Sequence, residues 1–260
     1  MTDGVERKVV EGADQRTAEI PDFTPYYQSE RATLFCGDAL EVLPTLPKKS
    51  VDLIATDPPY GVTWQSNRRT ERWAQLAGDD GTLDVVGLIG IALTALRPFR
   101  HIYCFGPADL SSLRLQSQVE LVWDKCIQGP GDLTLPWGPE HEPIQFSVFV
   151  PSGANKKRGD GRLACRIRQG SVIRVQRQNA SGVKRHPTEK PIALMRQLVE
   201  SSSVLGETVL DPFSGSGATL VAALLEGRKA VGIEIDVAFC SITADRLAAT
   251  EAILDKMEGL

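Results

Sequence analysis

The 260-residue sequence lacks the patterns that define several common classes of protein. Its five cysteines are scattered and form no C-x-x-C pair, which argues against a zinc site and against a disulfide framework. No apolar run is long enough to span a bilayer, and the polar opening stretch MTDGVERKVVEGADQRT does not resemble a signal peptide. We therefore expect a cytoplasmic protein with no metal site and no membrane segment.

The chain length fits one sizeable domain with a small insertion. Residues 1–25 are polar and without periodicity, so we expect a flexible N-terminal arm before a single domain over 26–260. In that domain, apolar runs typical of buried parallel strands alternate with amphipathic helical segments, which predicts an α/β, doubly wound sheet. Ligands of such sheets bind at the carboxyl ends of the strands, where the runs VDLIATDPPY and ETVLDPF place Asp57 and Asp211.

The net charge of −4 hides a strong asymmetry. Residues 151–186 contain ten Lys or Arg residues and one acid, Asp160, so this segment carries +9 while the rest of the chain carries −13. A basic segment on an acidic body predicts a localised contact with a polyanion, and a solvated loop is the alternative. Arg68 and Arg69 lie in a second polar stretch, after Asp57, which is either a further contact or a solvated lid.

The stretch LDPFSGSGATL, from Leu210 to Leu220, combines a strand-end acid with two glycines that open a helix. Gly215 and Gly217 let the backbone approach a ligand, and the first turn of the helix supplies free N–H donors. Glu234 ends the next predicted strand, where a carboxylate can accept both hydroxyls of a ribose. The turn has neither the G-x-G-x-x-G spacing of a dinucleotide site nor the Lys-Ser/Thr of a phosphate-binding loop. A nucleoside ligand without a pyrophosphate therefore fits best, and a tight turn with an incidental acid is the alternative.

DPFSGSGAT together with DPPYG resembles the paired signature of the amino-group (N6-adenine or N4-cytosine) DNA methyltransferases, which use S-adenosylmethionine. The strings CGDAL, VWDK, HEPI and HPTEKP are similar to further motifs of that family. The match covers about residues 31–250, and the catalytic motif precedes the cofactor motif, as in the permuted β-group. The resemblance implies a Rossmann-like, mostly parallel sheet of about seven strands, and it places the target-recognition insertion at 151–186.

The resemblance also assigns roles to three sets of residues. The catalytic residues would be Asp57, Pro58, Pro59 and Tyr60. The cofactor would be bound by Asp38, at the adenine amino group, and by Ala39, Thr188, Lys190, Asp211, Phe213, Ser214, Gly215, Ser216, Gly217, Glu234 and Ile235. Double-stranded DNA would be bound by Arg68, Arg69, Lys156, Lys157, Arg158, Arg166, Arg168, Arg174, Arg177, Lys184 and Arg185.

The DPPY motif suits an exocyclic amino group, whose nitrogen is a poor nucleophile because its lone pair is delocalised into the ring. Acceptors on its two N–H groups favour a pyramidal nitrogen and stabilise the positive charge that develops during methyl transfer. The Asp57 carboxylate and the Pro58 carbonyl can supply these acceptors, on a backbone held by successive prolines. Tyr60 offers a face on which a base withdrawn from the duplex can stack. A helix cap at Asp57 and a simple strand stop at the prolines are the alternatives.

The first residue of this motif is more often Asp in the N6-adenine enzymes of the family and Ser in the N4-cytosine enzymes. The resemblance therefore favours site-specific methylation of adenine N6 in duplex DNA, with N4-cytosine as the first alternative. An RNA or protein-glutamine methyltransferase is another alternative, although those relatives generally place the glycine motif first. An inactive DNA-binding relative is the third. Cytosine-C5 methylation needs a Cys nucleophile, usually in a Pro-Cys context, and no such pair occurs. Because the recognition segment is short, a homodimer is a further expectation.

Overall fold

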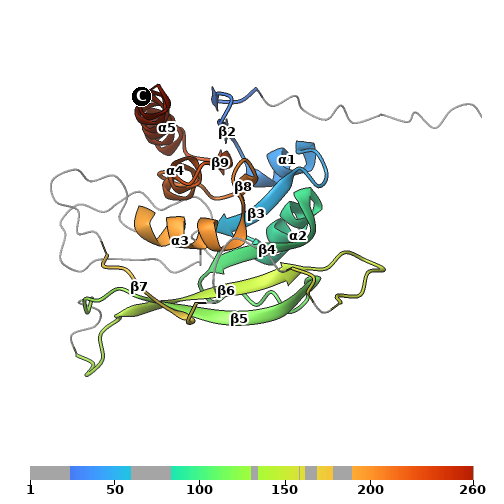
Figure 1. Cartoon of the computed structure of the whole chain (residues 1–260). Helices are drawn as coiled ribbons and strands as arrows, with labels where there is room; N and C mark the ends of the chain where they lie inside the picture. Colours follow the sequence, from blue (N-terminus) through green and yellow to red (C-terminus); the bar gives the residue numbers. More distant parts are fainter. Residues whose placement is uncertain are drawn as a thin grey trace, which may run out of the picture.

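The computed structural model describes residues 24–59, 83–129, 134–157, 159–161, 169–177 and 189–259. Strands and helices alternate over much of these residues, but the described residues between 96 and 174 form four strands that follow one another without a helix (Figure 1). In chain order they are β1 (Tyr27–Gln28), β2 (Ala32–Cys36), α1 (Ala39–Val42), the 3-10 helix η1 (Leu43–Thr45), β3 (Val51–Thr56), α2 (Val85–Ala95), β4 (Leu96–Phe105), β5 (Leu115–Asp124), β6 (His141–Phe149), β7 (Val172–Arg174), α3 (Ile192–Ser202), β8 (Thr208–Asp211), α4 (Ala218–Leu225), β9 (Lys229–Glu234) and α5 (Val237–Glu258).

The nine strands of the described residues form one sheet in the order β1-β2-β9-β8-β3-β4-β6-β5-β7. Strands β2, β9, β8, β3 and β4 run parallel to one another, whereas β6 is antiparallel to both β4 and β5. β1 and β7 are short edge strands of two and three residues. The predicted mostly parallel sheet is confirmed, and its longer strands agree with the expected number of about seven.

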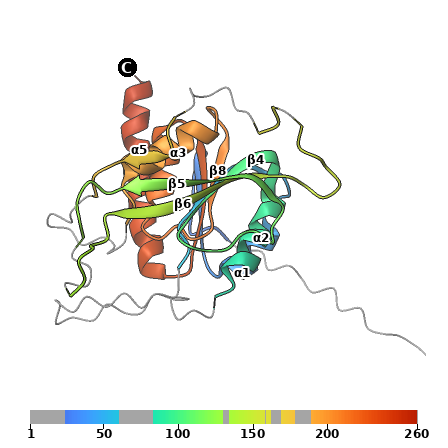
Figure 2. The same cartoon turned by 90° about the horizontal axis from the view of Figure 1, so that it is seen from below.

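Helices cover both faces of the sheet (Figure 1 and Figure 2). α3, α4 and α5 pack on one face, where Leu194, Leu220 and Leu247 belong to one apolar cluster. α1 and α2 pack on the other face, around Val42 and Ile89. Because β3 is covered on both sides, all six of its residues are buried, which explains the unbroken apolar run in the sequence.

β4 begins with an irregular stretch. α2 runs directly into the strand at Leu96, and the strand passes through Pro98. The pairing of β4 with β3 shifts in register before His101. Phe99 has a φ of 62°, and this irregular start accommodates a proline that a regular ladder would not.

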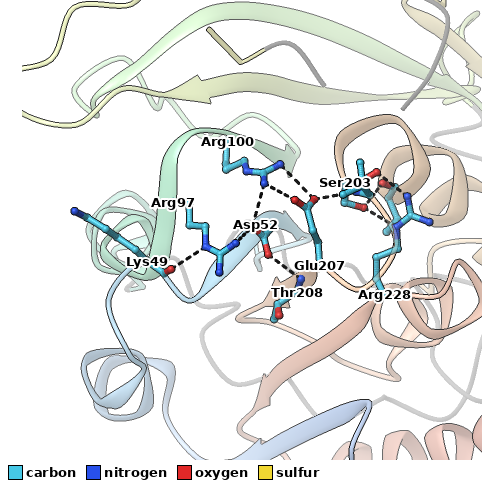
Figure 3. A network of polar contacts seen from close by, with 10 residues as sticks. Lys49, Asp52, Arg97, Arg100, Ser203, Glu207, Thr208 and Arg228 are labelled. Carbon is cyan, nitrogen blue, oxygen red and sulfur yellow. Dashed lines mark hydrogen bonds and ion pairs between the residues drawn. The ribbon is translucent and has the colours of Figure 1, made fainter. Parts of the chain in front are cut away.

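The parallel strands run in one direction, so their carboxyl ends lie along one side of the sheet and their starts along the other. The side formed by the carboxyl ends of β2, β9, β8 and β3 is called the site edge below, and the side formed by the starts of β3, β4 and β8 is called the opposite edge. A network of charged side chains occupies the opposite edge (Figure 3). Asp52 accepts hydrogen bonds from Arg97 Nη1 at 2.8 Å and from the Thr208 N–H at 3.0 Å. Arg100 pairs with both Asp52 and Glu207.

The first described strand is tied to the last helix. The Tyr27 hydroxyl donates to Glu251 at 2.7 Å, and Arg31 pairs with Asp255 at 2.5 Å. Of the predicted N-terminal arm, residues 1–23 lie outside the described residues. No helix in the described part of the chain is both long and apolar enough to cross a membrane.

Candidate active site

Three acidic side chains lie at the ends of adjacent parallel strands at the site edge. Asp57 follows β3, Asp211 ends β8 and Glu234 ends β9, and these strands are neighbours in the sheet. Thr56, the last residue of β3, donates its hydroxyl to Asp211 Oδ1 at 2.7 Å and so links two of the strand ends directly. The structure therefore brings the predicted catalytic acid together with the predicted cofactor acids.

The turn between β8 and α4 is held in a shape that favours glycine. Gly215 and Gly217 have φ values of 51° and 81°, and a Cβ on Gly217 would lie 2.7 Å from Thr243 Cγ2. Thr243 Oγ1 donates to the Gly215 carbonyl at 2.9 Å, and Arg246 Nη1 donates to the Ser216 carbonyl at 2.5 Å. Two side chains of α5 thus fix the turn at the start of α4, where free N–H groups favour a polar ligand.

Glu234 ends β9, and Asp38 follows the end of β2, the strand with which β9 is paired. Glu234 accepts hydrogen bonds from the N–H groups of Gly215 at 2.8 Å and Asp236 at 2.9 Å, and burial raises its pKa. Asp38 caps α1 by accepting from the Leu40 N–H at 2.8 Å. Glu234 is bonded to the glycine turn and Asp38 lies at the end of the neighbouring strand, which is where acceptors for the ribose and adenine of a nucleoside are expected.

Asp211 is buried behind the turn and accepts a hydrogen bond from the Phe213 N–H at 3.1 Å. Burial raises the pKa of Asp211 to about 6, against the opposing effect of hydrogen bonds from Thr219 and Thr56. At pH 7 the carboxylate is therefore mostly ionised in a region of low dielectric, where a neighbouring cation is strongly favoured. The other predicted cofactor residues at these strand ends are Ala39, Ser214 and Ile235, which lie in the same loops and helix start.

Asp57 is one end of a chain of charged side chains. Lys190 Nζ lies 2.5 Å from Asp57 Oδ2 and 2.9 Å from Glu142 Oε1. The other oxygen of Glu142, Oε2, lies 3.2 Å from Lys125 Nζ. Lys190 is only 8% exposed, and its ammonium group sits 4.9 Å from the centroid of the Phe105 ring. Lys190, which we predicted as a cofactor residue, therefore contacts the predicted catalytic carboxylate directly.

The two middle members of this chain, Lys190 and Glu142, are both charged at neutral pH. Burial lowers the pKa of Lys190, but the charges of Asp57 and Glu142 outweigh it, and the pKa is raised. Burial raises the pKa of Glu142, but Lys190 and Lys125 outweigh it, and the pKa is lowered. Asp57 is thus held by a fixed positive charge, while 25% of its side chain remains exposed to an incoming ligand.

The first part of the predicted recognition segment 151–186 follows β6 to the opposite edge of the sheet (Figure 1). Lys156 Nζ donates to Ser117 Oγ, near the start of β5, at 2.7 Å. The length of β5 separates Ser117 from the site edge by roughly 20 Å. Lys156 and its neighbour Lys157 therefore lie at the far end of β5 from Asp57.

The later described part of this segment, residues 169–177, lies at the site edge. β7 pairs in parallel with the last residues of β5. The exposed side chain of Arg174 forms an ion pair with Asp124 at 3.1 Å, and the Arg177 N–H donates to the Lys125 carbonyl at 3.3 Å. Only this part of the described recognition segment stands beside the charge chain that ends at Asp57.

After Asp57, Pro58 is buried and Pro59 is half-buried. The remaining predicted site residues lie outside the described residues, and they are Tyr60, Arg68, Arg69, Arg158, Arg166, Arg168, Lys184, Arg185 and Thr188.

Comparisons with known proteins agree with this geometry. A family model described as DNA methylase matches residues 110–245, which is more than half of the chain. The DNA adenine methyltransferase YhdJ of Escherichia coli (strain K12) is 28% identical over 255 residues, covering 85% of this chain and 84% of YhdJ. The M1.HpyAVI–SAM complex has a TM-score of 0.60 at 19% identity, over 83% of this chain and 99% of that chain. The PvuII DNA methyltransferase (cytosine-N4-specific) has a TM-score of 0.65 at 16% identity, over 86% and 89%.

The fold is that of the S-adenosylmethionine-dependent DNA methyltransferases. The chain belongs to the DNA methylase family of N6-adenine and N4-cytosine enzymes, as the motifs predicted. It is a DNA amino-methyltransferase, its cofactor is S-adenosylmethionine, and it acts on DNA.

Proposed function

We propose that the chain transfers a methyl group from S-adenosylmethionine to the N6 amino group of an adenine flipped out of duplex DNA at a specific sequence. The observation that carries the proposal is the Asp57 carboxylate, which the buried Lys190 holds at the end of β3, next to the strand that carries Asp211. This arrangement provides an anionic acceptor for an amino group beside the proposed cofactor loops.

In the proposed reaction, Asp57 and the Pro58 carbonyl accept the two N–H groups of the adenine amino nitrogen. As the nitrogen attacks, the N–C bond to the methyl group forms, the C–S bond of the sulfonium breaks, and the positive charge passes from sulfur to nitrogen. Asp57 stabilises that charge where it develops. The methylated nitrogen then loses one proton to water, which restores a neutral amino group.

Lys190 is proposed to position Asp57 rather than to touch the cofactor. An ammonium group that is fixed between two carboxylates limits rotation of the Asp57 side chain, so the acceptor needs no reorganisation when the base arrives. Glu142 and Lys125 continue the same support into β6 and β5.

The choice of adenine is supported by the Asp at the first position of DPPY and by the likeness to the adenine methyltransferase YhdJ. N4-cytosine remains the second candidate, because its chemistry needs the same acceptors and the PvuII enzyme shares the fold. A homodimer stays a prediction.

The test is to express the chain in a host without DNA methylation and to map modified bases across the DNA. Digestion to nucleosides should give N6-methyl-2′-deoxyadenosine. The mapped modified bases should all lie in one short, recurring sequence. N4-methylcytosine as the product would overturn the adenine assignment and keep the mechanism. Unmodified duplex DNA together with methylated RNA would overturn the proposed substrate.

A further inference from the structure

The loop between β5 and β6 presents a large apolar surface to solvent. The tip loop is defined here as residues 127–129 and 134–140. In it, Trp137 is 85% exposed and Leu135 is 61% exposed. A tryptophan with a leucine nearby is costly to leave in water, and such a surface indicates a place that is covered when the protein works. Pro136, between Leu135 and Trp137, and Pro139 restrict the backbone of this stretch, which lowers the entropy lost on binding.

The base of the tip loop is a paired hairpin. The Lys125 N–H donates to the Glu140 carbonyl at 2.9 Å, and the Gly129 N–H donates to the Pro139 carbonyl at 2.9 Å. These bonds continue the β5–β6 ladder beyond the two strands. Trp137 therefore lies two residues before the backbone that this hairpin holds in place.

The tip loop begins and ends at the charge chain that reaches Asp57. Lys125 stands just before the loop and Glu142 just after it, with 3.2 Å between their charged groups. Lys190 connects Glu142 to Asp57 through contacts of 2.9 and 2.5 Å. The exposed apolar surface thus extends from the site edge beside the proposed catalytic carboxylate.

Strand β7 supplies positive charge at the same place. Arg174 is exposed on β7, and the backbone of Arg177 is bonded to that of Lys125 at the base of the tip loop. Within its described residues the tip loop contains one acid, Glu140. In sequence, the stretches 162–168 and 178–188 on either side of β7 add five further Lys or Arg residues.

We infer that the tip loop is a DNA-wedging element, which inserts Trp137 and Leu135 into the duplex beside the flipped base. The inference rests on the proposed function. A base that leaves the stack exposes the faces of its neighbours, and proteins that distort DNA fill such gaps with apolar side chains or stack aromatic rings on the bases. Arg174 and Arg177 then contact the phosphates at the same edge.

Of the basic segment 151–186, which was predicted as a whole to bind DNA, only the later described part, residues 169–177, then lies against the duplex. The duplex lies against the site edge, with the tip loop and β7, and its main phosphate contacts do not include Lys156 and Lys157 at the far end of β5.

The first test measures the affinity of the full chain for a fluorescently labelled, mixed-sequence duplex in the presence of S-adenosylhomocysteine. Trp137→Ala should raise Kd about tenfold, roughly the contribution of one stacked base, and Trp137→Phe should recover most of the loss. Leu205→Ala is the matched control, because Leu205 is 76% exposed before β8 at the opposite edge. It should leave Kd unchanged, and all three variants should keep the wild-type Tm.

The second test compares two basic pairs. Changing Arg174 and Arg177 to Gln should reduce the slope of log K against log salt by about one unit for each phosphate that is no longer neutralised. Changing Lys156 and Lys157 to Gln should leave the slope nearly unaltered. A larger fall with the lysine pair would place the duplex elsewhere and overturn the inference.

The outcomes separate the inference from the proposed function. If the wild type methylates and binds duplex DNA while Trp137→Ala matches it in both, the inference alone fails. If Trp137→Ala changes the oligomeric mass and not the affinity, the tip loop is a subunit interface and the inference fails. If the wild type neither binds nor methylates duplex DNA, the proposed function fails as well.

Discussion

The two edges of the sheet use charged residues in different ways, although the same strands β3 and β8 supply both. At the opposite edge, Asp52 is 3% exposed and is bonded to Arg97, Arg100 and the Thr208 N–H (Figure 3). At the site edge, Asp57 is also paired with a cation, but a quarter of its side chain stays exposed. Four residues of one buried strand, 53–56, lie between these two aspartates.

The difference shows what distinguishes a structural charge network from a reactive one. Acids and arginines bond to one another at the opposite edge, so the network can fix the register of three strand starts. At the site edge the acids of three strand ends lie close together, and Asp57 among them stays partly exposed, where a cationic methyl donor and an amino group can complete the interactions of these acids. Substitutions at the two edges should therefore affect different measurements.

The largest effect is expected for Asp57→Ala. Loss of the acceptor should lower the rate of methyl transfer by ~10³-fold or more, because a group that stabilises developing charge is removed. The dissociation constant of S-adenosylmethionine, measured by calorimetry, should change little. A large loss of cofactor affinity would instead make Asp57 a binding residue.

The counterpart at the opposite edge is Asp52→Ala. Removing this anion takes away the acceptor of the Thr208 N–H and one of the two anions beside Arg100, which should lower the free energy of unfolding by about 3 kcal/mol. Denaturant unfolding measures the change, and the methylation rate per folded molecule should stay at the wild-type value. A variant of normal stability and reduced rate would contradict the assignment of this edge to structure.

Lys190→Met should separate positioning from cofactor binding. Without the ammonium group, the ion pair by which Lys190 orients the Asp57 carboxylate is lost, and kcat should fall by ~10²-fold with KM for S-adenosylmethionine nearly constant. Lys190→Arg should recover part of the rate. Lys125→Met is the matched control, because Lys125 pairs with Glu142 and not with Asp57. This variant should have a smaller effect on kcat. A rise in KM at constant kcat would restore the original cofactor assignment of Lys190.

Local sequence patterns predicted the strands, the helices and the convergence of Asp57, Asp211 and Glu234, because the ends of neighbouring parallel strands meet at one edge. They did not predict the charge chain. Glu142 meets its two lysines only through the register of β5 with β6 and the insertion of β6 beside β4. Both facts concern long-range pairing, for which the motifs VWDK and HEPI carry no local signal.

The division of segment 151–186 was missed for a similar reason. The segment is continuous in sequence and uniformly basic, so composition indicates a single surface. In the structure, the first residues of the segment follow β6 and lie at the opposite edge, whereas its later residues form β7 and lie at the site edge. Charge composition predicts that a polyanion is bound, whereas sheet topology decides which of the charges can reach it.

The smallest effect concerns the pH dependence of stability through Asp211. Its pKa in the folded protein, about 6, lies above the ordinary value of 3.8, so the folded state binds a proton more tightly than the unfolded chain does. The resulting stabilisation is complete below the unfolded pKa and is lost as the pH rises through the folded pKa. Between about pH 4.5 and 6.5 this loss should amount to about 2 kcal/mol.

Asp211→Asn isolates this contribution, because the amide oxygen can still accept from Thr56 and from the Phe213 N–H, while the titrating group is gone. The free energy of unfolding of the wild type, relative to this variant, should fall by that amount over the same interval. Equal pH dependence in the two proteins would mean that Asp211 ionises as readily when buried as in water. The carboxylate would then be fully ionised well below pH 6, and burial would impose no cost that a sulfonium cofactor could relieve.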